Sequence, residues 1–250
     1  MKWISHRGES CDAPENTLPA FALSLERNTD GMECDIHLTK DGVLVTNHDS
    51  NTLRTSGVES IIEESIFADL QKLDVCYDKK SYSPCRIPLF RDTLQFLGKN
   101  RVYYVEIKED DPRVIPAMVE ELEKAEIPPE QIVMISFKRN IVKLFKEAYP
   151  ERKALFLTSF RVFENGTWTP SADALIEELK ELKADGVDIH GNLTFLSKEY
   201  VQKVKEAGFS FAVWTIDEVE TAKRFVEFGV DAITSNCAAH LKQLIEQKGI

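Results

Sequence analysis

Short apolar segments rich in β-branched residues alternate with longer amphipathic segments along most of the chain. The short segments have the length of buried strands, and the longer ones have the spacing of helices that bury one face. Predicted strands cover residues 3–5, 31–35, 102–107, 132–136, 154–157, 186–189, 210–214 and 231–234. Predicted helices cover residues 18–27, 113–124, 139–149, 172–182, 198–207, 219–228 and 238–247. Eight strands with helices between them favour an α/β protein of the closed (β/α)8 TIM-barrel type over an open sheet.

One stretch interrupts this alternation. Lys40-Asp41-Gly42 predicts a hairpin turn, and a short extra strand then leads into His48. Residues 49 to about 90 are of mixed polar sequence, with one predicted helical segment at 61–73. We therefore expect a single domain over residues 1–250, in which a small insertion after the second strand caps the catalytic end of the barrel.

Charge and cysteine usage limit the partners. The chain of 250 residues carries 31 basic and 42 acidic residues, a net charge of −11, which disfavours nucleic acid and anionic membrane surfaces. No apolar run reaches the ~20 residues of a membrane span, and no signal peptide is recognisable. The scattered, odd set of cysteines predicts free thiols in a reducing compartment, so we expect a cytoplasmic protein. The sequence leaves open whether it forms a homo-oligomer.

Carboxylates stand at the ends of two predicted strands. Side chains alternate along a strand, so Glu33 and Asp35 share one face, and Glu106 shares a face with Lys108. In a barrel of this type the C-terminal strand ends point into the active site. Three converging carboxylates would suit one divalent cation, Mg²⁺ or Ca²⁺, better than zinc, which favours His and Cys.

The remaining polar residues suggest chemistry on a phosphodiester. With the cation bound, Arg7 and Lys108 would leave the three carboxylates with a formal excess of one positive charge, which a diester phosphate would neutralise. His6 and His48 are suited to moving the two protons that such a cleavage requires. We assign the base to His48 and the acid to His6. Each of these residues alone has a structural explanation, and it is their joint, ordered occurrence that favours a function.

These motifs resemble those of the glycerophosphodiester phosphodiesterase family, and the resemblance spans essentially the whole chain. The motifs are His6-Arg7-Gly8, Pro14–Thr17, Glu33-x-Asp35, Thr39–Gly42, His48-Asp49 and Glu106-x-Lys108, with weaker matches at Ser136-Phe137, Val213–Thr215 and Gly229–Asp231. The resemblance implies a TIM barrel and metal-dependent hydrolysis of a small-molecule glycerophosphodiester to glycerol 3-phosphate and an alcohol.

By position, the resemblance implies a role for each of the residues singled out above. It makes Glu33, Asp35 and Glu106 the metal ligands, His6 and His48 the acid/base pair, Arg7 and Lys108 the phosphate contacts, and Trp214 part of the substrate pocket. The chain departs from the family's usual Gly-Ile-Ile-Thr-Asp at Ala232–Asn236. We expect this departure to affect only the rim of the pocket.

Other residues and other functions are weighed against this hypothesis. His37 is expected to be a loop histidine outside the metal site, and Asp49 is a candidate to orient His48, although neighbours on an extended segment point apart. His190 is placed either at the pocket mouth or on the surface. Alternative functions are a lysophospholipase D or a cyclic-phosphate-forming phospholipase of the same superfamily, a non-catalytic phosphodiester-binding barrel, and, most distantly, a sugar isomerase or aldolase.

Overall fold

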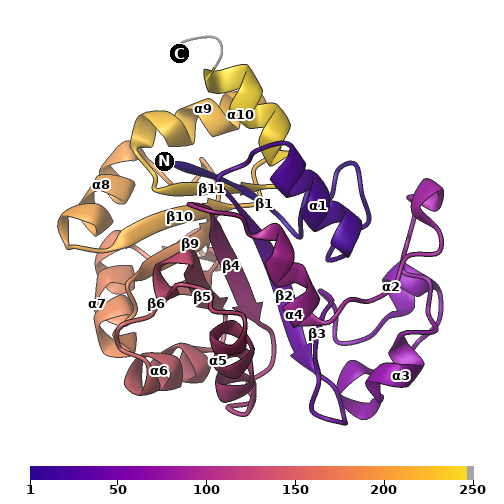
Figure 1. Ribbon diagram of the computed structural model, residues 1–250. Coiled ribbons are helices and arrows are strands. Elements are labelled where there is room, and N and C mark those ends of the chain that lie inside the picture. The colour runs from indigo at the N-terminus through magenta and orange to yellow at the C-terminus, as the bar shows by residue number, and fades with distance from the viewer. Residues whose placement is uncertain (247–250) are drawn as a thin grey trace.

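A computed structural model describes residues 1–246, and its centre is a closed barrel of parallel strands (Figure 1). Closure follows from the pairing of β1, which is hydrogen-bonded to β11 on one side and to β2 on the other. This confirms the predicted (β/α)8 TIM barrel. The barrel strands within the described residues are β1 (Lys2–Ser5), β2 (Gly31–Leu38), β4 (Val102–Ile107), β5 (Ile132–Ser136), β6 (Lys153–Thr158), β9 (Gly186–His190), β10 (Ser210–Trp214) and β11 (Ala232–Ser235).

Helices form a ring around this barrel because each buries one apolar face against the strands (Figure 1). The larger ones are α1 (Leu18–Glu26), α5 (Val114–Lys124), α6 (Arg139–Ala148), α7 (Ala172–Leu182), α8 (Lys198–Glu206), α9 (Val219–Phe228) and α10 (Ala238–Glu246). The predicted end of the last helix, Gln247, lies outside the described residues. No helix within residues 1–246 is long and apolar enough to cross a membrane.

Two apolar layers hold the barrel together. The outer layer lies between strands and helices and includes the fully buried Trp3, Phe145 and Phe225. The inner layer fills the barrel itself with the side chains Ile4, Val102, Tyr104, Val133, Ile135, Leu155, Leu157, Ala212 and Ala232. Each large side chain buried in this way stabilises the fold by about 1.5–3 kcal/mol. Because side chains fill the interior, the barrel is not an open channel. The polar residues at the C-terminal ends of the strands therefore form the floor of a pocket.

The segment after β2 leaves the barrel and builds a small structure of its own. The predicted hairpin is present, because β3 (Leu44–Thr46) pairs antiparallel with β2. Beyond it the chain carries α2 (Leu53–Ser56), α3 (Phe67–Leu70) and α4 (Phe90–Thr93), joined by short 3-10 turns. A separate apolar cluster of Val45, Ile62, Leu70, Val75 and Ile87 holds this insertion together.

The prediction of a single helical segment at 61–73 is wrong. The chain forms a 3-10 turn at Ile62–Glu64 and then starts α3 at Phe67, whose backbone N–H donates to the Asp41 carboxylate at 3.0 Å. The acceptor comes from the β2–β3 turn, so it fixes the helix start through a contact distant in sequence. A small hairpin, β7 (Arg161–Val162) with β8 (Trp168–Thr169), was likewise not predicted.

Candidate functional site

The predicted site residues gather where the barrel strands end. They line a cavity of about 230 Å³, with the exception of Asp35, which is buried and does not line it. His6 and Arg7 follow β1, Glu33 lies on β2, Glu106 and Lys108 come at the end of β4, and Trp214 ends β10. His48 reaches the same cavity from the segment just beyond β3. The sequence-based choice of strand ends therefore selects residues that share one cavity.

Three buried carboxylates form the acidic part of the site. Glu33, Asp35 and Glu106 each offer an oxygen, and these oxygens lie within 4.8 Å of one another. The register of the sheet explains this, because Asp35 is the direct neighbour of Glu106 across the β2–β4 pair. Oxygens from three buried carboxylates are the ligand set that a hard divalent cation prefers. The chemistry and spacing of this group therefore fit one Mg²⁺ or Ca²⁺ ion.

Two basic side chains border this acidic group. Lys108 Nζ lies 3.1 Å from Asp35 Oδ1 and 2.9 Å from Glu106 Oε1. Arg7 Nε lies 3.4 Å from Asp35 Oδ2. Buried charges of one sign are tolerated only with such partners, and both cations also lie on the cavity wall, where an anionic ligand would meet them.

The three carboxyls titrate differently because their surroundings differ. Burial, and then the nearby Asp35 charge, raises the pKa of Glu106 to about 8, and the same two causes hold the pKa of Glu33 well above its usual range. Burial alone would raise the pKa of Asp35 as well. Lys108 and Arg7 outweigh it and hold the pKa of Asp35 far below its usual range. Asp35 is therefore the carboxyl that stays ionised, and Glu106 takes up a proton near neutral pH.

The backbone around Arg7 explains the fixed order of the first motif. Arg7 has φ 56°, a left-handed conformation that aims its N–H at Glu33 Oε2, 2.9 Å away. Gly8 follows at φ 78°, and a Cβ there would meet the Ala20 backbone at 2.5 Å. Only glycine fits this turn. The tight turn thus delivers the neighbouring His6 and Arg7 to the same cavity.

Asn16 contributes to the site as a support of Asp35. Its Nδ2 donates to Asp35 Oδ2 at 2.8 Å, and the Asp35 backbone N–H donates back to its Oδ1 at 3.2 Å. Asn16 also has a left-handed backbone, which asparagine tolerates better than most residues. The Pro14–Thr17 motif therefore does more than start a helix, since it fixes the orientation of one carboxylate.

The ring of His6 is oriented by Asn236. His6 Nδ1 lies 2.7 Å from Asn236 Oδ1, and Asn236 Nδ2 donates to Asp217 Oδ2 at 2.6 Å. An ionised carboxylate can only accept, so the amide nitrogen faces Asp217 and the amide oxygen accepts from His6 Nδ1–H. The lone pair of the neutral ring is then on Nε2. Burial, and then Arg7, lowers the pKa of His6 to about 4, which keeps this ring neutral near pH 7.

This contact overturns one expectation from the sequence. The departure from the family pattern at Ala232–Asn236 was expected to affect only the rim of the pocket. Instead Asn236 holds His6, and Thr234 lines the cavity itself. The strand β11 lies beside β1 in the closed barrel, so residues separated by most of the chain become direct neighbours.

His48 has a different partner. Its Nδ1 lies 2.6 Å from Oδ1 of Asp49, the next residue in the chain. Asp49, the candidate to orient His48, is therefore in contact with it, and the two side chains do not point apart because residues 48–50 form a bend and not an extended strand. Burial lowers the pKa of His48, while the charge of Asp35 and the hydrogen bond to Asp49 oppose that decrease.

Of the other histidines, neither His37 nor His190 joins the acidic group. His37 was expected in a loop, but it is buried on β2, where its Nδ1 is hydrogen-bonded to Glu109. His190 is exposed at the end of β9, and its ring centre lies 5.5 Å from that of Trp214. His190 therefore lies close to the edge of the pocket.

Sequence reasoning missed several residues of the site. Asp188 on β9 lines the cavity and is 1% exposed, although an acidic residue in the middle of a predicted barrel strand was a signal that could have identified it. Arg54 on α2 binds both Glu15 and Asp49. Nothing in the local sequence indicated this, because the pairing depends on how the insertion folds back towards the barrel.

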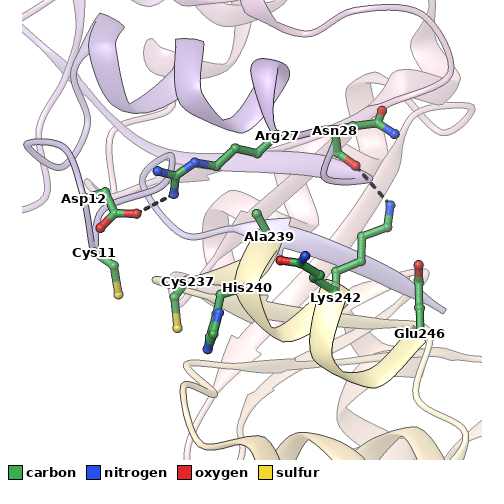
Figure 2. Close-up of a pocket in the computed structure, with 10 residues that line it drawn as sticks. Cys11, Asp12, Arg27, Asn28, Cys237, Ala239, His240, Lys242 and Glu246 are labelled. Atoms are coloured by element: carbon green, nitrogen blue, oxygen red, sulfur yellow. Dashed lines mark hydrogen bonds and ion pairs between the residues drawn. The ribbon is translucent and has the colours of Figure 1, made fainter. Parts of the chain in front are cut away.

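A wider hollow of about 770 Å³ lies elsewhere, between the end of α1 and the length of α10 (Figure 2). Its arginine and lysine side chains already have partners, since Arg27 is paired with Asp12 and Lys242 binds the Asn28 backbone oxygen and Asp30. None of the predicted site residues lines it. The smaller cavity at the strand ends, which has the buried acidic group, is therefore the candidate site.

Comparison with known proteins agrees with this choice. The model of the "Glycerophosphoryl diester phosphodiesterase family" matches residues 6–239. A glycerophosphodiester phosphodiesterase of Caldanaerobacter subterraneus is 29% identical over 98% of both chains. One of Bacillus subtilis is 24% identical over 93% of this chain and 82% of its own. The solved structure of an Oleispira antarctica phosphodiesterase in complex with the product sn-glycerol-3-phosphate matches with a TM-score of 0.87 and 26% identity, over 98% of this chain and 97% of that one.

Proposed function

Because the chain belongs to the glycerophosphoryl diester phosphodiesterase family, we propose that it hydrolyses glycerophosphodiesters to glycerol 3-phosphate and an alcohol. The observation that carries this proposal is the combination found in one cavity. A buried acidic group, two cationic side chains and two histidines all meet there. This is the equipment for binding and cleaving a phosphate diester.

We propose that Glu33, Asp35 and Glu106 hold one divalent cation, Mg²⁺ or Ca²⁺. Such an ion, when bound, polarises a phosphoryl oxygen and stabilises the charge that develops during displacement. It would also share the carboxylates that Lys108 now contacts. Lys108 and Arg7 would then be free to bind the anionic oxygens of the diester.

The two histidines would divide the proton transfers between them. His6 carries its lone pair on Nε2 and stays neutral near pH 7, which suits a base that activates the nucleophile. His48 contacts the carboxylate of Asp49, which stabilises a protonated ring and suits an acid that protonates the leaving alkoxide. These environments favour the opposite of the assignment made from sequence. Trp214 would line the substrate pocket.

The test is the release of glycerol 3-phosphate from glycerophosphocholine and glycerophosphoethanolamine, with EDTA and then with added Mg²⁺ or Ca²⁺. We expect EDTA to abolish release and one of the cations to restore it. Glu33→Ala should remove activity without unfolding the barrel, whereas Glu164→Ala, at an exposed loop position, serves as the matched control. An active Glu33→Ala enzyme would contradict the metal assignment. Phosphorus NMR of the products distinguishes glycerol 3-phosphate from a cyclic phosphate.

A further inference from the structure

Two buried polar side chains on the cavity have no role in the mechanism above. Asp188 lies on β9 and Thr234 on β11, and both line the cavity that holds Glu33 and Glu106. Their side chains are buried, with the residues 1% and 2% exposed. Within residues 1–246, Asp188 Oδ1 and Thr234 Oγ1 have no hydrogen-bond partner.

Unpaired buried polar atoms are costly, because burial removes the hydrogen bonds that water would make. Most buried polar side-chain atoms in folded proteins therefore have a partner. Here two such atoms lie on one cavity, which the buried side chain of Glu106 also lines. A ligand group that enters the cavity is the partner that would satisfy both atoms.

We propose that Asp188 and Thr234 form a subsite that binds a hydroxyl group of the glycerol moiety of the substrate. This inference rests on the proposed function, since it names what one end of the diester contacts. The phosphate would lie at the acidic group with Arg7 and Lys108, and the glycerol chain would extend from there towards β9 and β11.

A hydroxyl fits these two residues better than a cation does. Asp188 Oδ1 can accept a hydrogen bond, and Thr234 Oγ1 can donate or accept one. A hydroxyl also donates and accepts, so it can pair with either atom. Among the described residues, the only group with the geometry of a metal site is Glu33, Asp35 and Glu106, and Asp188 is not part of it.

The neighbouring walls suit the carbon chain of a small polyol. Leu157 is the register neighbour of Asp188 and lines the same cavity, as does Ile135. Trp214 closes one side, because its Nε1 donates to the Asp188 backbone oxygen at 3.1 Å and its ring packs edge-to-face on Phe137. The cavity thus combines apolar walls with a few polar groups that fix orientation, as is usual for small-molecule sites.

The test pairs substrates that differ only in hydroxyl groups. Glycerophosphocholine is compared with the phosphocholine diester of propan-1-ol, in the presence of the supporting cation. We expect the wild type to have a kcat/KM about 10- to 100-fold higher for the glycerol diester, because an analogue without the hydroxyl leaves the buried partners unpaired. Asp188→Leu and Thr234→Val should abolish most of that preference, because neither new side chain can pair with a hydroxyl. Asp188→Asn, which retains a side-chain oxygen that accepts a hydrogen bond, should keep most of the preference.

Leu157→Met is the matched control, since it alters the same wall without touching a polar atom. We expect it to change both substrates alike. Equal losses for both substrates in Asp188→Leu and Thr234→Val would mean a structural role and overturn the proposal. A loss that follows the choline group, seen as glycerophosphocholine weakened more than glycerophosphoglycerol, would overturn it as well.

Direct binding separates this proposal from the proposed function. Calorimetry compares glycerol 3-phosphate with propyl phosphate on the wild type and on Asp188→Leu. Tighter binding of glycerol 3-phosphate that disappears in Asp188→Leu supports the subsite even if the wild type hydrolyses no glycerophosphodiester. Equal affinities for the two phosphates on the wild type would reject the subsite, whatever the turnover.

Discussion

The imidazole of His48 faces the carboxylate of Asp49, its neighbour in sequence, with 2.6 Å between Nδ1 and Oδ1. The second carboxylate oxygen of Asp49 accepts from Arg54 Nε at 2.8 Å. Arg54 also donates two parallel hydrogen bonds to Glu15, of 2.8 and 2.7 Å, and Glu15 accepts in turn from Arg7. Through Arg54, a residue of the insertion, a continuous series of charged side chains therefore links Arg7 to His48.

Asp49→Asn tests whether this carboxylate supports His48. The substitution keeps the shape but removes the charge that stabilises a protonated ring, so we expect kcat to fall about 10- to 100-fold. The pKa of His48 should fall further, which moves the corresponding limb of the pH–rate profile to lower pH. The control is Asp69→Asn, an exposed residue whose ion-pair partner within residues 1–246 is Lys72. A lower kcat with an unmoved limb would point to a structural role instead.

We expect Arg54 to support catalysis through the planar shape of its guanidinium group as well as through its charge. Arg54→Ala should lower kcat about tenfold, since Asp49 and Glu15 lose their common partner. Arg54→Lys should restore only part of that loss, because an ammonium cannot reproduce the planar fork that binds Glu15. Steady-state kinetics of both variants, beside Arg113→Ala as an exposed arginine with its own local carboxylate, provides the measurement. Full activity in Arg54→Lys would contradict the prediction.

Much of the fold was predictable because it depends on local periodicity. The strand at 102–107 and the helix at 172–182 have their predicted bounds. A strand buried on both faces is a short, nearly continuous apolar run, and a helix buried on one face has an apolar period of 3.6 residues. The insertion was harder, because its elements are one turn long. Phe67 begins α3 only because Asp41, from a distant turn, accepts its N–H.

The same distinction applies to the site. Glu33 and Asp35 could be placed on one face from their spacing, and the register with β4 then brings Glu106 to them. The partners of the two histidines could not be placed in this way. Asn236 reaches His6 only because the barrel closes, and Asp49 reaches His48 only because the chain bends there.

Gly186→Ala should severely destabilise the protein. A Cβ at this position on β9 would lie 2.1 Å from the Ser210 backbone oxygen of the adjacent strand, and backbone in a closed barrel cannot move away. We expect a loss of about 3 kcal/mol or more in the free energy of unfolding, measured by chemical denaturation. Gly42→Ala is the comparison, since it has open space around it and φ +76°. It should cost only about 1 kcal/mol, for backbone strain alone. Similar losses for the two variants would refute the steric argument.

Glu106→Gln should make the metal-free protein more stable at alkaline pH. Burial, and then Asp35, raises the pKa of Glu106 to about 8 in the folded state, against a usual value of 4.5. Between these two values the folded protein holds a proton that the unfolded chain releases. The free energy of unfolding therefore falls as pH rises, by at most about 1.4 kcal/mol per pH unit for this group. Glutamine cannot titrate, so its variant lacks this decrease.

Denaturation in EDTA at pH 5, 6, 7 and 8 measures the difference. The advantage of Glu106→Gln over the wild type should grow with pH, whereas Glu120→Gln, an exposed residue on α5, should run parallel to the wild type. Parallel curves for Glu106→Gln would contradict the buried, protonated carboxyl. Added Mg²⁺ or Ca²⁺ should stabilise the wild type increasingly from pH 6 to 8, because the ion must displace the Glu106 proton. Either cation should leave the stability of Glu106→Gln almost unchanged, because this variant lacks one of the three carboxylates that the cation requires.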